Sequence, residues 1–164
     1  AYNRPSHLQA TLKSLIECNG SDEAPIIIFI DGPKTKSEAE LSEQVRLVAA
    51  DILGSKADIR VSQSNRGLSK SIVGGVGDVI AIHGRVIVVE DDLILARCFL
   101  QYMNEALNRY AANDRIFQIS GHMFNVPEFS GRDKALFLPM TTTWGWATWG
   151  RAWSAFDANA MGWE

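Results

Sequence analysis

The chain has 164 residues, of which 46% are hydrophobic and 21% charged, and its formal net charge is −3. These values are ordinary for one soluble globular domain, and the slightly acidic balance argues against a nucleic-acid-binding protein, which usually carries a basic face. No stretch approaches the roughly 20 apolar residues of a membrane span, and no signal peptide is visible. Its two cysteines, Cys18 and Cys98, form no disulfide or metal-binding pattern, so we expect a cytoplasmic protein.

Strand-like and helix-like segments alternate along the first half of the chain. Leucines at helical spacing after Pro5 predict a first helix, and the apolar run from Pro25 to Gly32 predicts a buried strand. The segment Ser37–Glu40 has the sequence of a capping box, in which a serine and a glutamate side chain each bond a free N–H at a helix start, and it predicts a second helix. A short strand is expected next, over residues 58–63.

The alternation continues through the second half. The expected elements are a helix over 69–82, a strand over 85–89, a helix over 95–110, strands over 115–121 and 135–140, and a Trp-rich segment, 141–153, leading into a last helix. Such alternation predicts a single α/β domain over residues 1–164, with a mostly parallel sheet flanked by helices. Neither end resembles a natural domain boundary, so we expect a fragment of a longer protein, truncated at both ends.

Polar residues lie where the expected strands end. Asp31 ends the first strand, Asn65 follows the second, and the triplet Glu90–Asp92 ends the third. Because ligands bind at the carboxyl ends of parallel strands, we expect these residues to share one edge of the sheet. Asp31 has an equally good interpretation as a turn residue in the sequence Asp-Gly-Pro.

The triplet Glu90–Asp92 raises an electrostatic question, because adjacent carboxylates repel one another and are costly to desolvate. A helix N-terminus would explain one aspartate but not three acids. Mg²⁺ or Mn²⁺ explains them better, since these ions bind carboxylates together with water and substrate phosphates. A metal–phosphate site would be helped by Arg4, Arg66 and Lys70, although each could equally be a surface charge.

The Trp-rich segment has two interpretations. Its tryptophans could pack in the core, or they could form a platform for the apolar face of a sugar. Gly145, between Trp144 and Trp146, suggests a place where a ligand approaches the backbone. The chain has no phosphate-binding loop, no histidine spacing typical of zinc and no nucleophile elbow.

Taken in order, these segments resemble the GT-A glycosyltransferases, which use nucleotide-sugar donors and have a Rossmann-like fold. The matching segments are AYNRPSHLQATLKSL, IIIFIDG, NRGLSKS, VIVVEDDLILARCFLQYM, QISGHMFN and TTTWGWATWGRAW. The opening is similar to family 2 sugar transferases. The later segments are similar to the N-acetylglucosaminyltransferases that initiate N-glycan branching.

The resemblance implies transfer of a sugar from a UDP-sugar to an acceptor hydroxyl, with inversion and with Mn²⁺ or Mg²⁺ as cofactor. It implies that Asp92 is the metal ligand and that Glu90 and Asp91 face the ribose or the donor sugar. Asp31 would accept a hydrogen bond from uracil, and Arg4 would lie near the base and diphosphate.

The same resemblance places Gly145 and Trp146 beside the donor sugar and acceptor. In inverting relatives an aspartate base follows the Trp-rich segment by about twenty residues, so the base is expected beyond Glu164, and Asp157 is not expected to replace it. The first strand of the fold would begin before Ala1.

Two other functions stay open. A nucleotidyltransferase that makes nucleotide sugars would usually carry a glycine-rich, basic loop after its first strand, and AYNRPSH has none. A non-catalytic module that binds a sugar or nucleotide would need no base, which suits a chain in which no base is identified.

Overall fold

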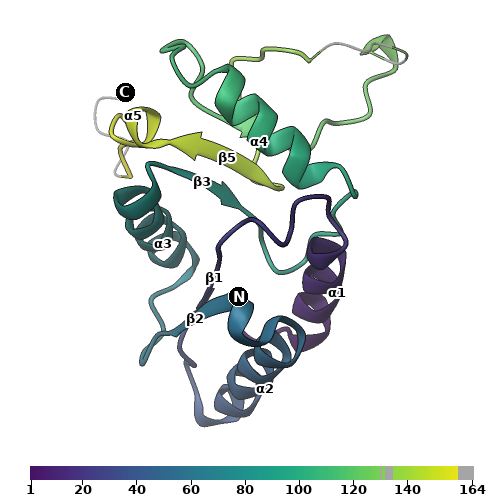
Figure 1. The fold of residues 1–164 in the computed structure, drawn as a ribbon. Coiled ribbons are helices and arrows are strands. Elements are labelled where there is room, and N and C mark those ends of the chain that lie inside the picture. Colours follow the sequence, from purple (N-terminus) through teal and green to yellow (C-terminus); the bar gives the residue numbers. More distant parts are fainter. Residues whose placement is uncertain (130, 132–134, 159–164) are drawn as a thin grey trace.

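A computed structural model describes residues 1–129, 131 and 135–158 (Figure 1). The elements in chain order are α1 (Pro5–Ile16), β1 (Ile26–Ile30), α2 (Lys36–Leu53), the 3₁₀ turn η1 (Gly54–Lys56), β2 (Ala57–Val61), α3 (Leu68–His83), β3 (Arg85–Val88), α4 (Phe99–Arg109), β4 (Ile119–Ser120), the 3₁₀ turn η2 (Pro127–Phe129), β5 (Trp146–Trp149) and α5 (Gly150–Trp153). Within these residues, no helix combines the length and the apolar character needed to cross a membrane.

The strands form two sheets. β1 and β2 pair in parallel, with Ile28 opposite Ile59, whereas β5 lies between β3 and β4 and runs antiparallel to both. The prediction of a mixed α/β domain is confirmed. The prediction of a mostly parallel sheet is wrong for the described residues, because the chain reverses direction before β5 and inserts this strand beside β3.

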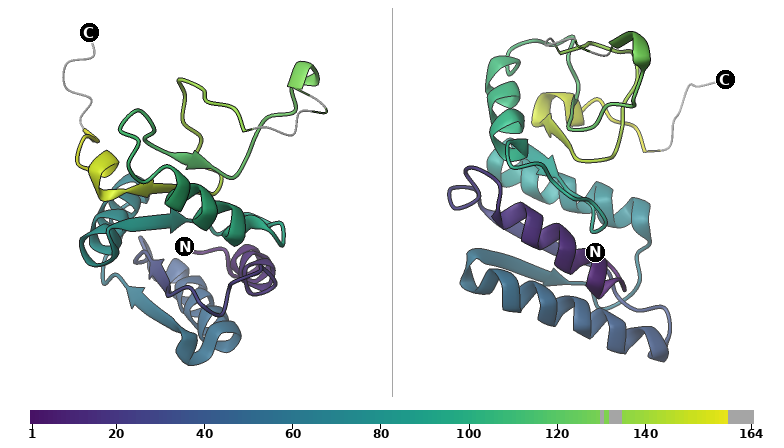
Figure 2. Two further views of the ribbon diagram at one scale, coloured as in Figure 1. Left: turned by 45° about the horizontal axis from the view of Figure 1, so that its top comes forward. Right: turned by 90° about the vertical axis from the view of Figure 1, so that its right-hand side faces the viewer.

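Helices cover both faces of the strands (Figures 1 and 2). Helix α3 lies on one side of β1 and β3, while α1 and α2 pack together on the other side. The larger core joins α1, α2, β1, α4 and β5 through fully buried side chains such as Leu12, Val45 and Met103. A smaller core lies under α3, where Val76 packs with Val86 and Trp146.

The N-cap of the second helix lies two residues before the predicted one, Ser37. Thr35 is the N-cap of α2, and its hydroxyl accepts a hydrogen bond from the backbone N–H of Glu38 at 3.3 Å. The Glu38 carboxylate in turn accepts from the N–H of Lys34 at 3.1 Å. The capping interaction is therefore built on Thr35 and Glu38, and the prediction based on Ser37–Glu40 is wrong by two positions.

The glycines of α3 allow this helix to approach β1. A Cβ atom on Gly75 would lie 3.2 Å from the ring of Phe29, a residue of β1. Gly84, at φ 72°, ends the helix in a left-handed conformation and donates its N–H to the carbonyl of Ile80 at 2.8 Å. The absence of a side chain at Gly75 thus allows α3 to pack closely against β1.

The largest error in the predicted elements concerns the Trp-rich segment. The segment contains a strand, β5, whose four residues are all buried, and only the short helix α5 follows it. Trp149 donates its indole N–H to the carbonyl of Leu107 in α4, at 3.0 Å. Side chains that alternate between the two faces of a strand can bury a tryptophan on each face, which explains how Trp146 and Trp149 reach different cores.

Two further predicted strands differ. Residues 135–140 form no strand, and Phe137 within them packs edge-on against Tyr110 at the end of α4. The strand predicted over 115–121 is reduced to the two residues of β4, because its pairing with β5 is limited to Ile119 and Ser120.

Candidate functional site

The acidic triplet lies directly after β3 and is met by an arginine from the other end of the chain. Arg4 precedes α1, and its Nη1 lies 3.0 Å from Oδ2 of Asp92. Its Nη2 forms an ion pair with Asp91. The Asp91 side chain is only 6% exposed, whereas those of Asp92 and Arg4 are 40% and 45% exposed. A buried carboxylate and a solvent-facing one thus share a single guanidinium.

The backbone places Arg4 at this point. The Ala1 ammonium group donates to the carbonyl of Phe29 at 2.8 Å, and the N–H of Asp31 donates to the carbonyl of Ala1 at 3.0 Å. Residues 1–4 therefore connect the end of β1 to the end of β3. The ends of these two strands thus lie close together, but in the described residues β1 and β3 belong to different sheets and share no sheet edge.

Glu90 is the half-buried member of the triplet. Burial raises the pKa of its carboxyl group above the ordinary value, and the negative charges of Asp92 and Asp91 raise it further. A hydrogen bond from the Thr143 side chain acts in the opposite direction. Thr143 immediately precedes Trp144, so the loop before β5 contacts the acidic triplet.

Asp31 has a different environment. Its carboxylate accepts hydrogen bonds from the N–H groups of Gly32, Arg66 and Gly67 at 2.9 to 3.0 Å, and from the side-chain amide of Asn65 at 3.1 Å. These four donors match the roughly four lone-pair sites of a carboxylate. Asp31 thus holds the loop that leads into α3, and a uracil N–H would have to displace one of these donors.

Arg66 and Lys70 do not reach the acidic triplet. Both residues are exposed, and the Arg66 guanidinium lies against α3, where a Cβ on Gly74 would come within 2.8 Å of it. Lys70 lies in the first turn of α3. The structure therefore brings together Arg4, Asp91 and Asp92 from the predicted set, and leaves the other two cations at a separate surface.

A second cavity, of about 550 Å³, begins one residue beyond Asp92. Leu93, Gly145, His122 and Trp144 line it, and the ring of Phe124 packs beside His122 and Trp144. We call His122, Phe124 and Trp144 the aromatic cluster, and all three side chains are exposed. The His122 and Trp144 rings meet edge to face with centroids 4.8 Å apart, and those of Phe124 and Trp144 lie 5.7 Å apart. Aromatic faces of this kind are typical of sugar-binding surfaces.

Gly145 lines the second cavity, whereas the side chain of Trp146 points into the smaller core. Gly145 has φ 67°, and a Cβ atom there would lie 3.0 Å from the Phe99 ring, so both backbone conformation and space favour glycine. Trp146 is 8% exposed, and its side chain packs with Val86 in the smaller core. Among the predicted tryptophans, Trp144 is 49% exposed and is the one that faces the second cavity.

The donor set fits a hard divalent cation that takes few protein ligands. In the described residues, no group of three or more histidine, cysteine, aspartate or glutamate side chains is arranged to hold a metal ion. Asp92 has one oxygen on Arg4 and a second, Oδ1, with no hydrogen bond among the described contacts, and Glu90 adds a carboxylate nearby. Mg²⁺ commonly uses one or two carboxylates and fills its remaining positions with water and phosphate.

Sequence reasoning gave no site role to Thr143, His122 or Phe124. The position of β5 could have indicated a role for Thr143. Because β5 begins at Trp146 and pairs antiparallel with β3, the residues just before Trp146 lie beside the end of β3. Asp157 follows α5, at the opposite end of β5 from Gly145. The catalytic base was predicted beyond Glu164, outside the described residues.

A comparison with models of known protein families and with curated proteins found no match.

Proposed function

We propose that the chain is the nucleotide-sugar-binding part of a metal-dependent glycosyltransferase of the GT-A type, which moves a sugar from a UDP-sugar to an acceptor hydroxyl with inversion. One observation carries the proposal. A pair of carboxylates at the end of β3 is held by a single half-exposed arginine, and the next residue lines a cavity walled by aromatic rings. Charge for a diphosphate and a surface for a sugar are therefore adjacent.

The acidic triplet and Arg4 supply the diphosphate chemistry in this proposal. Asp92, through Oδ1, and Glu90 would hold Mn²⁺ or Mg²⁺, which when bound neutralises the charge that develops on the diphosphate leaving group. Arg4 would exchange its carboxylate partners for phosphate oxygens, because a guanidinium binds both in the same forked geometry. Asp91 would keep Arg4 within reach of the donor.

The aromatic cluster supplies the sugar surface. Trp144 would stack on the apolar face of the donor or acceptor sugar, and the backbone at Gly145 would allow close approach. Replacing Trp144 by alanine should weaken binding of a UDP-sugar while leaving binding of UDP unchanged. The exposed position of Trp144 predicts little effect of this change on stability.

Calorimetric titration with UDP, with and without Mn²⁺, tests the proposal. We expect Mn²⁺ to tighten UDP binding about tenfold or more, corresponding to at least about 1.4 kcal/mol. The Asp92→Asn variant should lose this metal effect. The matched control is Asp51→Asn, an exposed aspartate on α2. UDP binding that is equal with and without Mn²⁺ would contradict the metal role of Asp92.

A second candidate, a non-catalytic nucleotide-sugar-binding module, is favoured by the way Arg4 already neutralises Asp91 and Asp92 within the chain. Such a module would bind UDP-sugar without Mn²⁺ and would not release UDP from it. Slow, Mn²⁺-dependent hydrolysis of UDP-sugar by the protein would exclude this candidate. Formation of UDP-sugar from UTP and a sugar 1-phosphate would instead support a nucleotidyltransferase.

A further inference from the structure

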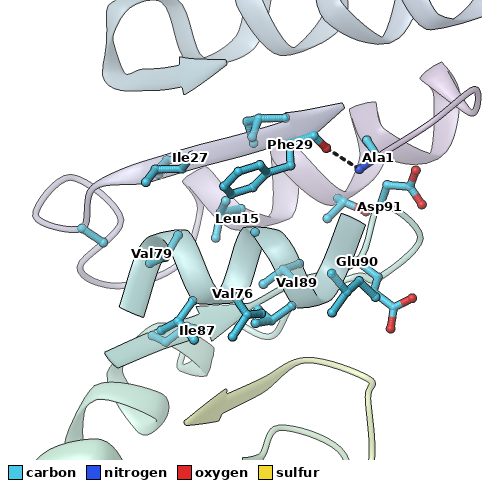
Figure 3. Close-up of a pocket in the computed structure, with 18 of the residues that line it drawn as sticks. Ala1, Leu15, Ile27, Phe29, Val76, Val79, Ile87, Val89, Glu90 and Asp91 are labelled. Atoms are coloured by element: carbon cyan, nitrogen blue, oxygen red, sulfur yellow. Dashed lines mark hydrogen bonds between the residues drawn. The ribbon is translucent and has the colours of Figure 1, made fainter. Parts of the chain in front are cut away.

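The largest cavity of the described residues, about 1250 Å³, has apolar walls and one polar end (Figure 3). Ala1, Glu90 and Asp91 lie at the polar end in this view, and residues 2–4 also line the cavity. The guanidinium of Arg4, which pairs with Asp91 and Asp92, is carried by a long side chain with many rotamers. It keeps this position only if the backbone of residues 2–4 is itself held in place.

Helix α1 holds Arg4 from one side only. The carbonyl of Arg4 accepts a hydrogen bond from the N–H of Leu8 at 3.1 Å, at the start of α1. Arg4 itself has φ −119° and ψ 72°, outside the helical region, and its side chain makes no capping hydrogen bond to α1. The path of the chain before Arg4 must therefore be fixed by contacts with other parts of the molecule.

The Glu38 carboxylate, in the first turn of α2, makes these contacts. Its Oε2 accepts a hydrogen bond from the hydroxyl of Tyr2 at 2.7 Å, and its Oε1 accepts a longer one from the side-chain amide of Asn3 at 3.4 Å. The two bonds span 36 and 35 positions of the sequence, so they belong to the tertiary structure. One carboxylate thus holds both residues that directly precede Arg4.

The same carboxylate also holds the loop after β1. The backbone N–H of Lys34 donates to Glu38 Oε2 at 3.1 Å and to the hydroxyl of Tyr2 at 3.2 Å. The Lys34 ammonium group lies 5.8 Å from the centroid of the Tyr2 ring. The Tyr2 hydroxyl therefore donates to one group and accepts from another, which defines its position. Glu38 joins three segments: the start of α2, the loop after β1 and residues 2–3.

Capping of α2 does not account for the contacts with residues 2–3. A glutamate three positions after the N-cap completes a capping box by bonding backbone N–H groups at the start of its own helix. It needs no side chain from elsewhere in the chain. The hydrogen bond from Tyr2 is nevertheless the largest cause that lowers the pKa of Glu38 below its ordinary value, ahead of the backbone bonds from Lys34 and Thr35. The charge of Glu38 is thus matched to a partner outside α2.

We propose that Glu38 is a positioning residue for Arg4. Through Tyr2 and Asn3 it fixes the path of residues 2–4, and this path directs the guanidinium toward the acidic triplet. Glu38 acts through these neighbours, and none of its hydrogen bonds described above reaches the triplet. The consequence for diphosphate binding rests on the proposed function, whereas the position of the guanidinium does not.

NMR spectroscopy of the chain with ¹⁵N-labelled arginine, without nucleotide or metal, tests the position of the guanidinium. The Arg4 signal is assigned by its loss in Arg4→Lys. In Glu38→Ala this signal should move toward that of an unpaired arginine, and in Tyr2→Phe it should move part of the way. Glu38→Gln keeps an acceptor oxygen for Tyr2 and should restore most of the parent signal.

The matched control is Thr35→Ala, which removes the N-cap hydroxyl of α2 and leaves the bonds of Glu38 to Tyr2 and Asn3 in place. It should not move the Arg4 signal, although it loosens the same helix end. An Arg4 signal that is the same in Glu38→Ala and in the parent would overturn the proposal, and so would an equal shift in Thr35→Ala.

A double-mutant cycle, measured by calorimetric titration with UDP in the presence of Mn²⁺, tests the consequence for binding. Glu38→Ala should weaken UDP binding about fivefold in the parent and should have no further effect in the Arg4→Ala background. Unchanged UDP binding in Glu38→Ala, or a loss that persists without Arg4, would overturn the proposal. If the parent chain binds no UDP, the proposed function fails, and the NMR comparison still decides whether Glu38 positions Arg4.

Discussion

Acidic residues follow both β1 and β3, and their charges are neutralised in different ways. Asp31, after β1, is surrounded by four uncharged donors, three of them backbone N–H groups within 3.0 Å. Asp91 and Asp92, after β3, both pair with the guanidinium of Arg4, whose side chain is 45% exposed. Backbone donors cannot leave without unfolding the loop, whereas a half-exposed side chain can change partners.

The difference separates a structural acid from one that is available for binding. The Asp31 carboxylate accepts one hydrogen bond from Gly32 and three from residues 65–67, so its charge is part of the fold. The charge of Asp92 is compensated by a group that a phosphate could attract away. Each of these acids follows an apolar strand, so their position in the sequence does not predict the difference in how they are neutralised. Three variants, one of them measured in two ways, test this contrast.

The largest effect is expected for Asp31→Ala. The change leaves the buried N–H group of Gly32 and the part-buried N–H groups of Arg66 and Gly67 without an acceptor, and it should lower the free energy of unfolding by about 3 kcal/mol. Chemical denaturation measures this loss. Asp22→Ala removes an aspartate whose side chain is 82% exposed and should have no measurable effect. Equal stability of the two variants would mean that Asp31 does not hold the loop.

Arg4→Ala should have the next largest effect on stability. Asp91 would remain buried without its cation, at a cost of about 1 to 2 kcal/mol, reduced from the value for a fully buried pair because Arg4 is half exposed. Denaturation of Arg46→Ala gives the comparison, since its partner Glu43 is 53% exposed where Asp91 is 6% exposed, and this variant should show no measurable change. A loss as large as that for Asp31→Ala would remove the contrast between the two sites.

The same Arg4→Ala variant should bind metal more tightly in the absence of nucleotide. Its guanidinium competes with a cation for Asp92, so its removal should improve the Mn²⁺ affinity several-fold, by up to about tenfold. Titration of free Mn²⁺ by electron paramagnetic resonance measures this change. Binding of UDP should weaken in the same variant, because the diphosphate loses its arginine. Weaker binding of both ligands would indicate that Arg4 positions the acids and does not compete for them.

The smallest effect is expected for Glu90→Gln and depends on pH. Burial and two neighbouring negative charges raise the pKa of Glu90 in the folded chain, so its ionised form weakens the fold as the pH rises through that pKa. At pH 8 the variant should therefore melt about 1 to 2 °C above the parent, and at pH 4 the two should coincide. Glu40→Gln, at an exposed position in α2, is the control. A variant that is less stable at pH 8 would reverse the assigned sign.

The sequence predicted the order of most helices and strands because their apolar periodicity is strong. The strands at Ile26–Ile30 and Arg85–Val88 and the helix at Leu68–His83 lie within two residues of their expected bounds at each end. Periodicity failed at Trp146–Trp149, where tryptophans three positions apart fit a helix as well as a strand buried on both faces. That ambiguity is resolved by tertiary packing, which a single sequence does not display.

Prediction of the site succeeded where it depended on strand ends and failed where it depended on side-chain direction. The acids after β3 do lie close to the end of β1, and Arg4 reaches them. The metal ion expected beside these acids stays a prediction, and the structure adds an ion pair with Arg4, 87 positions away from Asp91 in the sequence. The contact between these two distant residues depends on the path of residues 1–4, and no local sequence pattern predicts that path.

The tryptophans of β5 fix the register of this strand against β3. Trp146 packs into the core under α3, and Trp149 packs against α4, on the opposite face. A slip of β5 by one residue along β3 would exchange its faces and force each indole out of its own core. Thr143 and Trp144, which lie a few residues before the strand, are thereby aligned with Glu90 by packing that neither residue takes part in. The alignment of the binding surface is inherited from the hydrophobic core.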